Sequence, residues 1–286
     1  MASIAQPTTL VPATRARRPT RLGRALRTLA SRRAALTAHN PRQIAVPMIT
    51  PIFFALVIAP ALKTALGGLH SHIDYTAFVA VGTVGLLVPL ATTFAGLSVL
   101  VDRDSGAQRE LLAAPIPRPL LVLGNLIVVI SLCALQVIVV IAAAALRGAA
   151  FHIRPSGVVW FAAAVLLFAV LMYAIAEILA ARIGRQEDYI AATPVIAIVP
   201  WFLAGALYPI AALPGAITTF AKLLPLTHAL ALMRYGFVDQ KGTGLHDIWG
   251  MSNTTIEAWL SLAVVTIFAA AFMALAVRAF TRSAVS

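Results

Sequence analysis

Six long apolar stretches, separated by short polar connectors, constrain this chain more than any other feature of its sequence. They occupy residues 44–66, 77–101, 120–146, 158–181, 191–213 and 258–277. Each is about as long as the ~20 apolar residues that a helix needs to cross the hydrocarbon core of a bilayer. Only 11% of the residues are charged, against about 25% in a soluble domain. The sequence therefore predicts an all-α, polytopic membrane protein with six transmembrane helices.

The distribution of lysine and arginine predicts the orientation of these helices. Sixteen of the 22 Lys and Arg residues lie in four segments, namely 1–43, 102–119, 182–190 and 278–286. Because cytoplasmic connectors carry an excess of Lys and Arg, these four segments are expected on the cytoplasmic side. Both chain ends then lie inside the cell, in agreement with an even number of spans.

The predicted domain organisation follows from the same charges. Residues 1–43 form a cytoplasmic basic segment, part of it disordered and part an interfacial helix carrying Leu22, Leu26 and Leu29. The six helices make one transmembrane domain over 44–277, and 278–286 is a cytoplasmic tail. A net charge of +12 also fits nucleic-acid binding, but basic residues in front of an apolar span set topology and contact anionic lipid. We expect membrane lipids as partners and no nucleic acid.

One further apolar segment, 216–233, complicates the count of spans. It carries Lys222, Pro225 and His228, and charged groups and a central proline make a simple crossing costly. A full crossing there would give seven spans and place the C-terminus outside. We interpret the segment instead as a re-entrant or surface-lying pair of helices on the extracellular side, between the fifth and sixth transmembrane helices.

The sequence shows no catalytic apparatus of its own. It lacks a Walker A motif, a dinucleotide fingerprint, an H-E-x-x-H motif and a nucleophile elbow. His70 and His72 beside Asp74 favour a solvated loop over a metal site, and the single cysteine, Cys133, is interpreted as a small buried hydrophobe. We therefore expect a chain that is not an enzyme and binds no cofactor or metal.

The connector over 101–119 has the most informative local pattern. Asp102, Arg103 and Asp104 precede a short helical stretch with an apolar ridge, and prolines at 115, 117 and 119 end that stretch. A short helix displayed stiffly on the cytoplasmic face suits docking into a groove of another protein. On the residues alone, an ordinary solvated connector is an equally good interpretation.

The same stretch resembles the E-R-E-x-G-T-x-E-x-L-x-x-x-P-x-x-x-x-x-x-x-G-K pattern of the ABC-2 type transporter permeases. Asp102, Arg103 and Asp104 stand at the acid–Arg–acid run, and Gly106, Glu110, Leu112, Pro115 and Gly124 match in order. Ala107 and Asn125 depart from it, since the family usually has Thr and Lys there. A second stretch, from Leu224 to Arg234, is similar to the family's N-P-L-T-Y-x-x-x-x-x-R before the last span. The resemblance covers about residues 40–280.

The resemblance implies a permease that works with other subunits. Two permeases would pair, as a homodimer or a related heterodimer, and each would engage a cytoplasmic ABC ATPase subunit that holds ATP and Mg. The connector would be the coupling helix between helices 2 and 3, and 214–236 the extracellular re-entrant pair. The implied ATPase contacts are Asp102, Arg103, Asp104, Gly106, Arg109, Glu110, Leu111, Leu112 and Pro115. The implied re-entrant motif is Pro225, Leu226, Thr227, His228 and Arg234.

Polar and aromatic groups within the apolar stretches are candidates for a translocation path, because polar groups are expensive in a membrane. The candidates are Thr92, Thr93, Phe94, Glu177, Trp201 and Phe202. Threonine hydroxyls also bond to the backbone of their own helix, so that interpretation of Thr92 and Thr93 stays open. Glu177 lies near the cytoplasmic end of the fourth stretch and is expected either to extend toward Arg182 or Arg185 or to bind a cationic substrate.

The function that these observations predict is ATP-driven export of lipophilic compounds, such as drugs or antibiotics, across the inner (plasma) membrane of a bacterium. An exporter of cell-wall lipid or lipid-linked polysaccharide is the alternative within the family. A proton-driven secondary transporter is the alternative outside it, although the predicted spans carry a single acidic residue, Glu177, and proton relays usually have more.

Overall fold

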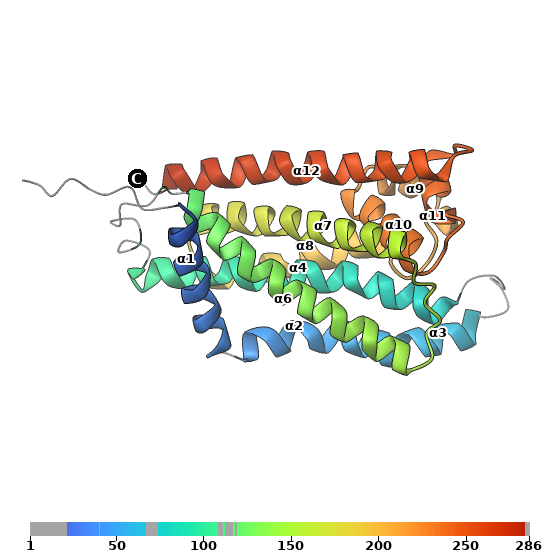
Figure 1. Cartoon of the computed structure of the whole chain (residues 1–286), viewed down its shortest axis with the longest axis horizontal. Helices are drawn as coiled ribbons and strands as arrows, with labels where there is room; N and C mark the ends of the chain where they lie inside the picture. The colour runs from blue at the N-terminus through green and yellow to red at the C-terminus, as the bar shows by residue number, and fades with distance from the viewer. Residues whose placement is uncertain are drawn as a thin grey trace, which may run out of the picture.

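The structure is a computed structural model that describes residues 22–39, 41–66, 74–107, 111, 117 and 119–283. Within these residues every regular element is a helix, which confirms the predicted all-α class. The helices form one elongated bundle (Figure 1).

Four long helices make the body of the bundle. They are α4 (Tyr75–Asp104), α6 (Pro119–Leu146), α7 (Pro155–Arg182) and α12 (Thr254–Ser283). They run along the long axis (Figure 1), and α7 lies at the centre, packed against α4, α6 and α12. Within the described residues, these are the four helices that are by themselves long and apolar enough to cross a membrane. They correspond to the second, third, fourth and sixth predicted stretches.

The first predicted stretch is also helical but is interrupted. It consists of α2 (Arg42–Phe53), a π-helical turn η1 (Phe54–Ile58) and α3 (Ala59–Leu66), which together run along α4. Its apolar part, Met48–Ala61, is shorter than the four long helices. A π-helical turn inside a helix is rare and is often found at functional sites.

The prediction that residues 191–213 form one transmembrane helix is wrong at the C-terminal end of that stretch. The helix α8 covers Gln186–Leu203 and stops ten residues earlier than predicted. Gly205 then adopts a left-handed conformation (φ 72°), and only a short 3₁₀ turn, η2 (Ile210–Ala212), follows. The reason is tertiary, because the carbonyls of Gly205 and Ala206 accept hydrogen bonds from Arg234 instead of continuing the helix.

The segment that complicated the count of spans is a bent helical pair. Helices α9 (Gly215–Ala221) and α10 (Pro225–Phe237) meet at 81°, and the pair would be a fifth span if it crossed the membrane as one unit. Pro225 is the first residue of α10. The N–H of a residue at this position makes no hydrogen bond within the helix, so proline, which lacks an N–H, is well tolerated there. Helix α11 (Thr243–Trp249) completes this end of the bundle (Figure 1).

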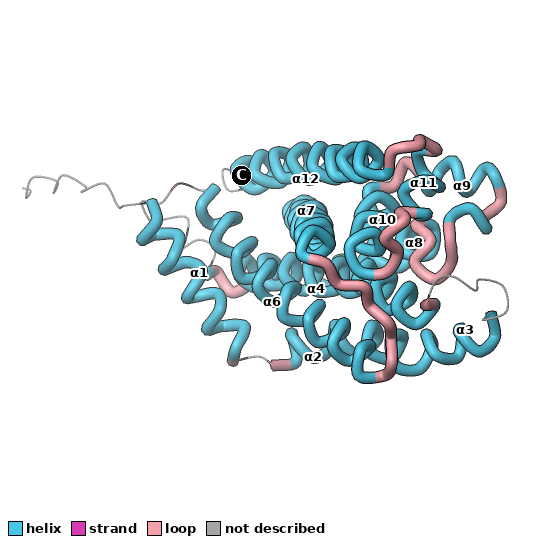
Figure 2. Tube along the Cα trace, turned by 45° about the vertical axis from the view of Figure 1, so that its right-hand side comes forward, coloured by secondary structure: helices cyan, strands magenta, loops and turns pink. Residues whose placement is uncertain are grey.

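The two ends of the bundle are built differently. Helix α1 (Leu22–Ala38) packs on α6 at the end where α12 finishes, whereas α9, α10 and α11 lie at the opposite end (Figures 1 and 2). Glycines on α4 allow it to pack closely against the segment after α8 and against α10. A Cβ on Gly82 would lie 2.0 Å from the carbonyl oxygen of Ala206, and one on Gly85 would lie 3.0 Å from Leu230. This glycine pair therefore has a packing role.

Candidate functional site

Three successive charged residues at the end of α4 bind three different parts of the bundle. Asp102 accepts a hydrogen bond from Nη1 of Arg33 on α1 at 3.2 Å. Arg103 donates to the carbonyl of Gly184 at 2.7 Å, just beyond α7. Asp104 accepts from Nε2 of Gln186, the first residue of α8, at 2.7 Å. We call these side chains, together with Arg33 and Gln186, the connector cluster.

Arg103 closes the C-terminal end of α7. Its guanidinium also donates to the carbonyls of Ile183 at 3.3 Å and Ala180 at 3.5 Å. The last carbonyls of a helix have no partner within it and carry partial negative charge. A planar guanidinium, which presents several donors at once, suits such a cluster of carbonyls. Arg103 therefore joins the end of α4 to the end of α7 through the backbone carbonyls, and its Nε also lies 3.8 Å from Oδ1 of Asp104.

Helix α1 presents one of its arginines to the bundle interior. Leu29, Arg33 and Thr37 are spaced four residues apart, so they share one face of α1. Arg33 and Thr37 are buried on this face, at 8% and 9% exposure. Gly124 on α6 permits the contact, because a Cβ there would lie 2.9 Å from Cβ of Leu29. The burial of Arg33 explains why its charge is paired with Asp102.

The coupling segment itself lies largely outside the described residues. Arg109, Glu110, Leu112 and Pro115 are among the residues that the structure does not describe. Gly106 has a positive φ of 79° and turns the chain at the end of α4. Leu111 is helical and half-buried. The predicted ATPase contacts of these residues stay predictions, whereas Asp102, Arg103 and Asp104 are already engaged within this chain.

The threonines of the predicted path bond to their own helix. The hydroxyls of Thr92 and Thr93 both donate to the carbonyl of Pro89, at 3.0 and 2.7 Å. Trp201 is buried and donates from its indole N–H to the carbonyl of Gly82 at 2.7 Å. The hydrogen bonds of these three side chains within the bundle therefore explain their position inside the apolar helices without a role in transport.

The two phenylalanines of the predicted path are more accessible. Phe94 is half-buried, and Phe202 on α8 is 43% exposed. Neither the path nor its lining is traced by these contacts, so the path stays a prediction.

Glu177 does not extend toward Arg182 or Arg185 as expected. Arg185 instead pairs with Glu187 at 2.6 Å, and Glu177 is 3% exposed. Its carboxylate lies beside the hydroxyl of Tyr173, one turn earlier on α7. Its Oε1 atom has no hydrogen-bond partner among the described residues. The carboxylate points inward because Glu177 lies on the same face of α7 as Tyr173 and Ala180, both buried.

The second predicted motif is assembled at the opposite end of the bundle. Arg234 is buried and donates to the carbonyls of Gly205 at 2.9 Å and Ala206 at 2.7 Å. Its guanidinium carbon lies 3.4 Å from the ring centre of Phe78 on α4, a cation–π contact. Arg234 thus joins α10, the segment after α8 and the start of α4.

The other members of this motif hold the bent pair together. Thr227 donates to the carbonyl of Ala221 at 2.6 Å, across the bend. His228 contacts the carbonyl of Lys222 at 2.9 Å and the hydroxyl of Ser261 on α12 at 3.2 Å. Leu226 is buried against Gly85 of α4. The motif is therefore a set of packing and bend-forming residues.

Sequence reasoning missed two members of the connector cluster. From the sequence, Arg33 contributes only to the positive charge of segment 1–43, and nothing indicates a functional role for Gln186. The signal for Arg33 was available in its spacing, because Arg24, Arg27 and Arg32 fall on other faces of the helix and are exposed. No local signal distinguishes Gln186 from any other residue at the start of a helix.

Comparisons with known proteins agree with this architecture. The sequence model of the ABC-2 type transporter family matches residues 24–238, a range that includes most of α1, the connector cluster and α10. Nodulation protein J of Sinorhizobium fredii (strain NBRC 101917 / NGR234) is 27% identical over 190 residues, which cover 64% of this chain and 71% of that protein. This multi-pass membrane protein belongs to the ABC-2 type transporter family.

Proposed function

We propose that this chain is the permease subunit of an ATP-driven exporter of lipophilic compounds in the inner (plasma) membrane of a bacterium. The chain itself does no catalysis; ATP and Mg are held by two copies of a separate ATPase subunit. Six helical segments cross the membrane: the α2–η1–α3 run, α4, α6, α7, α8 and α12. Both chain ends face the cytosol, and α9 and α10 form a re-entrant pair at the extracellular exit.

The connector cluster is the observation that carries this proposal. The coupling segment leaves α4 at Ser105, directly after Asp104. A push or pull on that segment would reach α1 through Asp102, α7 through Arg103 and α8 through Asp104. Charge-assisted hydrogen bonds are short and directional, so they transmit displacement better than an apolar contact that can slide. A subunit that receives force from a partner needs such an arrangement at its receiving end.

The outer face of α8 supports pairing with a second permease. Tyr189, Ala197 and Trp201 are the residues of α8 that are buried within this chain. Val195, Val199 and other large apolar side chains on the remaining faces are exposed. The helix also contains two prolines, Pro194 and Pro200, whose effect on its backbone hydrogen bonds is best compensated by a neighbouring helix. We propose that a homologous permease covers this face.

Labelling of single cysteines tests the orientation. In a Cys133→Ala background, Ser105→Cys should react with a membrane-impermeant maleimide only after the cells are opened, and Lys241→Cys should react in intact cells. The two positions lie at opposite ends of the bundle and follow α4 and α10. Reaction of Ser105→Cys from outside intact cells would overturn the orientation and, with it, the coupling role.

Transport assays test the energy source. Membranes should yield a complex of this chain with an ATP-binding subunit, and proteoliposomes containing both should export only while ATP is hydrolysed. Export that persists without ATP but stops when the proton gradient is dissipated would favour the secondary transporter instead.

The substrate class has a second candidate, the export of cell-wall lipid or lipid-linked polysaccharide. The relative described above is named for nodulation and not for drug resistance, so its name does not favour a drug. A mostly apolar groove of about 370 Å³ between α1 and α6, lined by Ala30, Ala34 and Ile127 among others, favours a substrate with a long hydrocarbon chain. Competition between a lipophilic drug and a lipid for export in the same proteoliposomes separates the two candidates.

A further inference from the structure

A groove runs between α1 and α6 on the outside of the bundle. Its volume is about 370 Å³, within the roughly 300–1,000 Å³ of small-molecule sites. The groove is open along its length and mostly apolar. Its lining includes Ala30, Ala34 and Ala38 of α1 and Ile127, Ser131 and Leu132 of α6. Small side chains on α1 leave this space because they do not reach across to α6.

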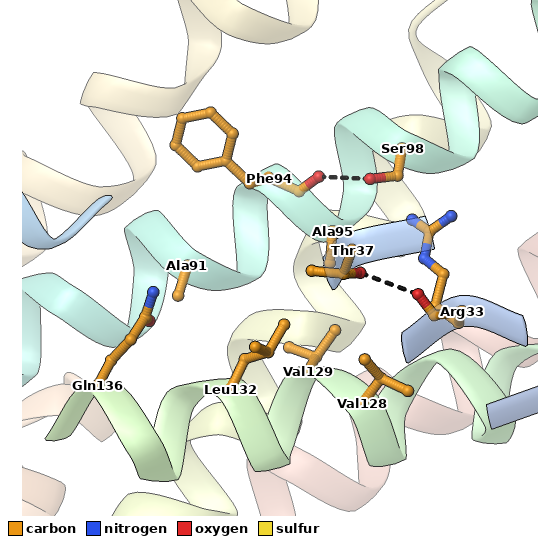
Figure 3. A pocket seen from close by; sticks show the side chains of 10 residues that line it. All are labelled: Arg33, Thr37, Ala91, Phe94, Ala95, Ser98, Val128, Val129, Leu132 and Gln136. Atoms are coloured by element: carbon orange, nitrogen blue, oxygen red, sulfur yellow. Dashed lines mark hydrogen bonds between the residues drawn. The ribbon is translucent and has the colours of Figure 1, made fainter. Parts of the chain in front are cut away.

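A smaller cavity, whose lining Figure 3 shows, adjoins the groove. The cavity measures about 30 Å³ and shares Thr37, Val128 and Leu132 with the groove. Arg33 and Gln136, which are both buried, lie at its two ends. A volume of this size holds about one water molecule or the oxygen atoms of one polar group. The lining thus changes from mostly apolar in the groove to a mixture in the cavity, where Arg33, Ser98 and Gln136 lie among apolar side chains.

The charges on α1 favour an anion, and Arg33 among them also faces Asp102 and Glu177 of the bundle. Helix α1 contains no acidic residue in its 17 positions. Arg24, Arg27 and Arg32 are exposed on it, and Arg33 lines the inner cavity. Arginines near a membrane surface attract anionic headgroups, and a guanidinium binds phosphate or carboxylate oxygens with two parallel hydrogen bonds.

We propose that the groove and its inner cavity form an entry site for an anionic amphiphile taken from the cytoplasmic leaflet. One hydrocarbon chain lies between α1 and α6, and the anionic headgroup sits at the mouth of the cavity, directed at Arg33. The inference rests on the proposed exporter function and names the class of its substrate. A hydrocarbon chain gains little by moving from lipid into an apolar groove, so the arginine supplies most of the selectivity.

Occupancy of the site affects the connector cluster directly. The headgroup and Asp102 bind the same guanidinium, that of Arg33. Substrate binding therefore weakens the contact that holds α1 to the end of α4. This gives the permease a way to report a loaded site to the coupling segment.

Photocrosslinking tests the site without requiring transport. The probe is phosphatidic acid with a diazirine in one acyl chain, presented to the purified protein in phosphatidylcholine nanodiscs, with the crosslinked residues mapped by mass spectrometry. Crosslinks are expected at Ile127 and Ser131. Ala34→Trp fills the groove and should lower them at least about tenfold, whereas Ala35→Trp, an exposed neighbour outside the groove, should change them less than about twofold.

The role of the headgroup is tested by a second probe. The same diazirine chain on phosphatidylcholine should label the groove several-fold less than the phosphatidic acid probe does. Arg33→Gln should remove that preference, and Arg33→Lys should retain part of it.

Two results would overturn the inference. One is labelling of the groove no stronger than at Ile267, which is lipid-exposed on α12 at 66%, and the other is labelling unaffected by Ala34→Trp. Because crosslinking needs neither ATP nor the ATPase, its failure beside intact ATP-driven export refutes the entry site alone. Export without ATP would refute the proposed function instead.

Discussion

The ion pair between Arg33 and Asp102 makes a quantitative prediction about α1. The Arg33 side chain is 9% exposed and that of Asp102 is 21% exposed. Asp102→Asn removes the anion that hydrogen-bonds to Arg33 and leaves only the longer-range attraction of Glu177; breaking a buried pair from one side costs about 3–5 kcal/mol. Because Asn keeps an acceptor oxygen and the site retains some solvent, we expect the lower end of that range. A loss of about 3 kcal/mol raises the fraction of undocked α1 about 150-fold.

A thiol on the docked face of α1 measures that fraction. Thr37 is 9% exposed, at the inner edge of the groove between α1 and α6, so Thr37→Cys should react slowly with a maleimide while α1 is docked and fast when α1 leaves α6. The native Cys133 is replaced by Ala to remove background. In nanodiscs, Asp102→Asn should raise the labelling rate of Thr37→Cys by about two orders of magnitude.

The neighbouring aspartate supplies the matched control. Asp104 is 48% exposed and contacts Gln186, not α1, so Asp104→Asn should leave the rate within about twofold of the parent. An unchanged rate in Asp102→Asn, or an equal rise in Asp104→Asn, would refute the reasoning that this one ion pair holds α1 in place.

Three further predictions concern the rest of the bundle. Arg234→Lys keeps the charge but loses the fork that binds two carbonyls, and should lower the free energy of unfolding by about 2 kcal/mol in thermal melts; an unchanged melting temperature would contradict this. Gly82→Ala places a Cβ 2.0 Å from a backbone oxygen and should destabilise by about 1–3 kcal/mol, whereas Gly215→Ala, which faces open space, should be close to neutral. The alternative role of Glu177, the binding of a cationic substrate, predicts that Glu177→Gln lowers export of cationic compounds and spares neutral ones in vesicle assays; equal export of both by the variant would end that role for the carboxylate.

Much of the helical framework follows from local sequence signals. The starts and ends of α4, α6 and α7 lie within three residues of the predicted stretches. The bend between α9 and α10 falls just before Pro225. These signals are local because an apolar run and a proline act on the backbone of the segment that contains them.

The two predictions that the structure contradicts, the end of the fifth helix and the partner of Glu177, failed because of packing in the tertiary structure. The fifth stretch is apolar to residue 213, yet α8 ends at Leu203 because Arg234 binds the carbonyls that follow it. Glu177 turns inward toward Tyr173 and leaves Arg185 to Glu187. In both cases the partner is chosen by packing, which the sequence near the residue does not encode.

By itself, the sequence determined that the protein is helical, that it belongs in a membrane and that its connector after Asp104 matches a transporter family. Only the tertiary structure decided that α1 docks on α6, that Arg33 is its buried anchor and that the acid–Arg–acid run binds three separate segments. The physical reason is that lipid is as apolar as the helices, so association depends on a few polar contacts and close backbone approaches. Such contacts join residues far apart in the chain, and each of these residues looks ordinary in the sequence alone.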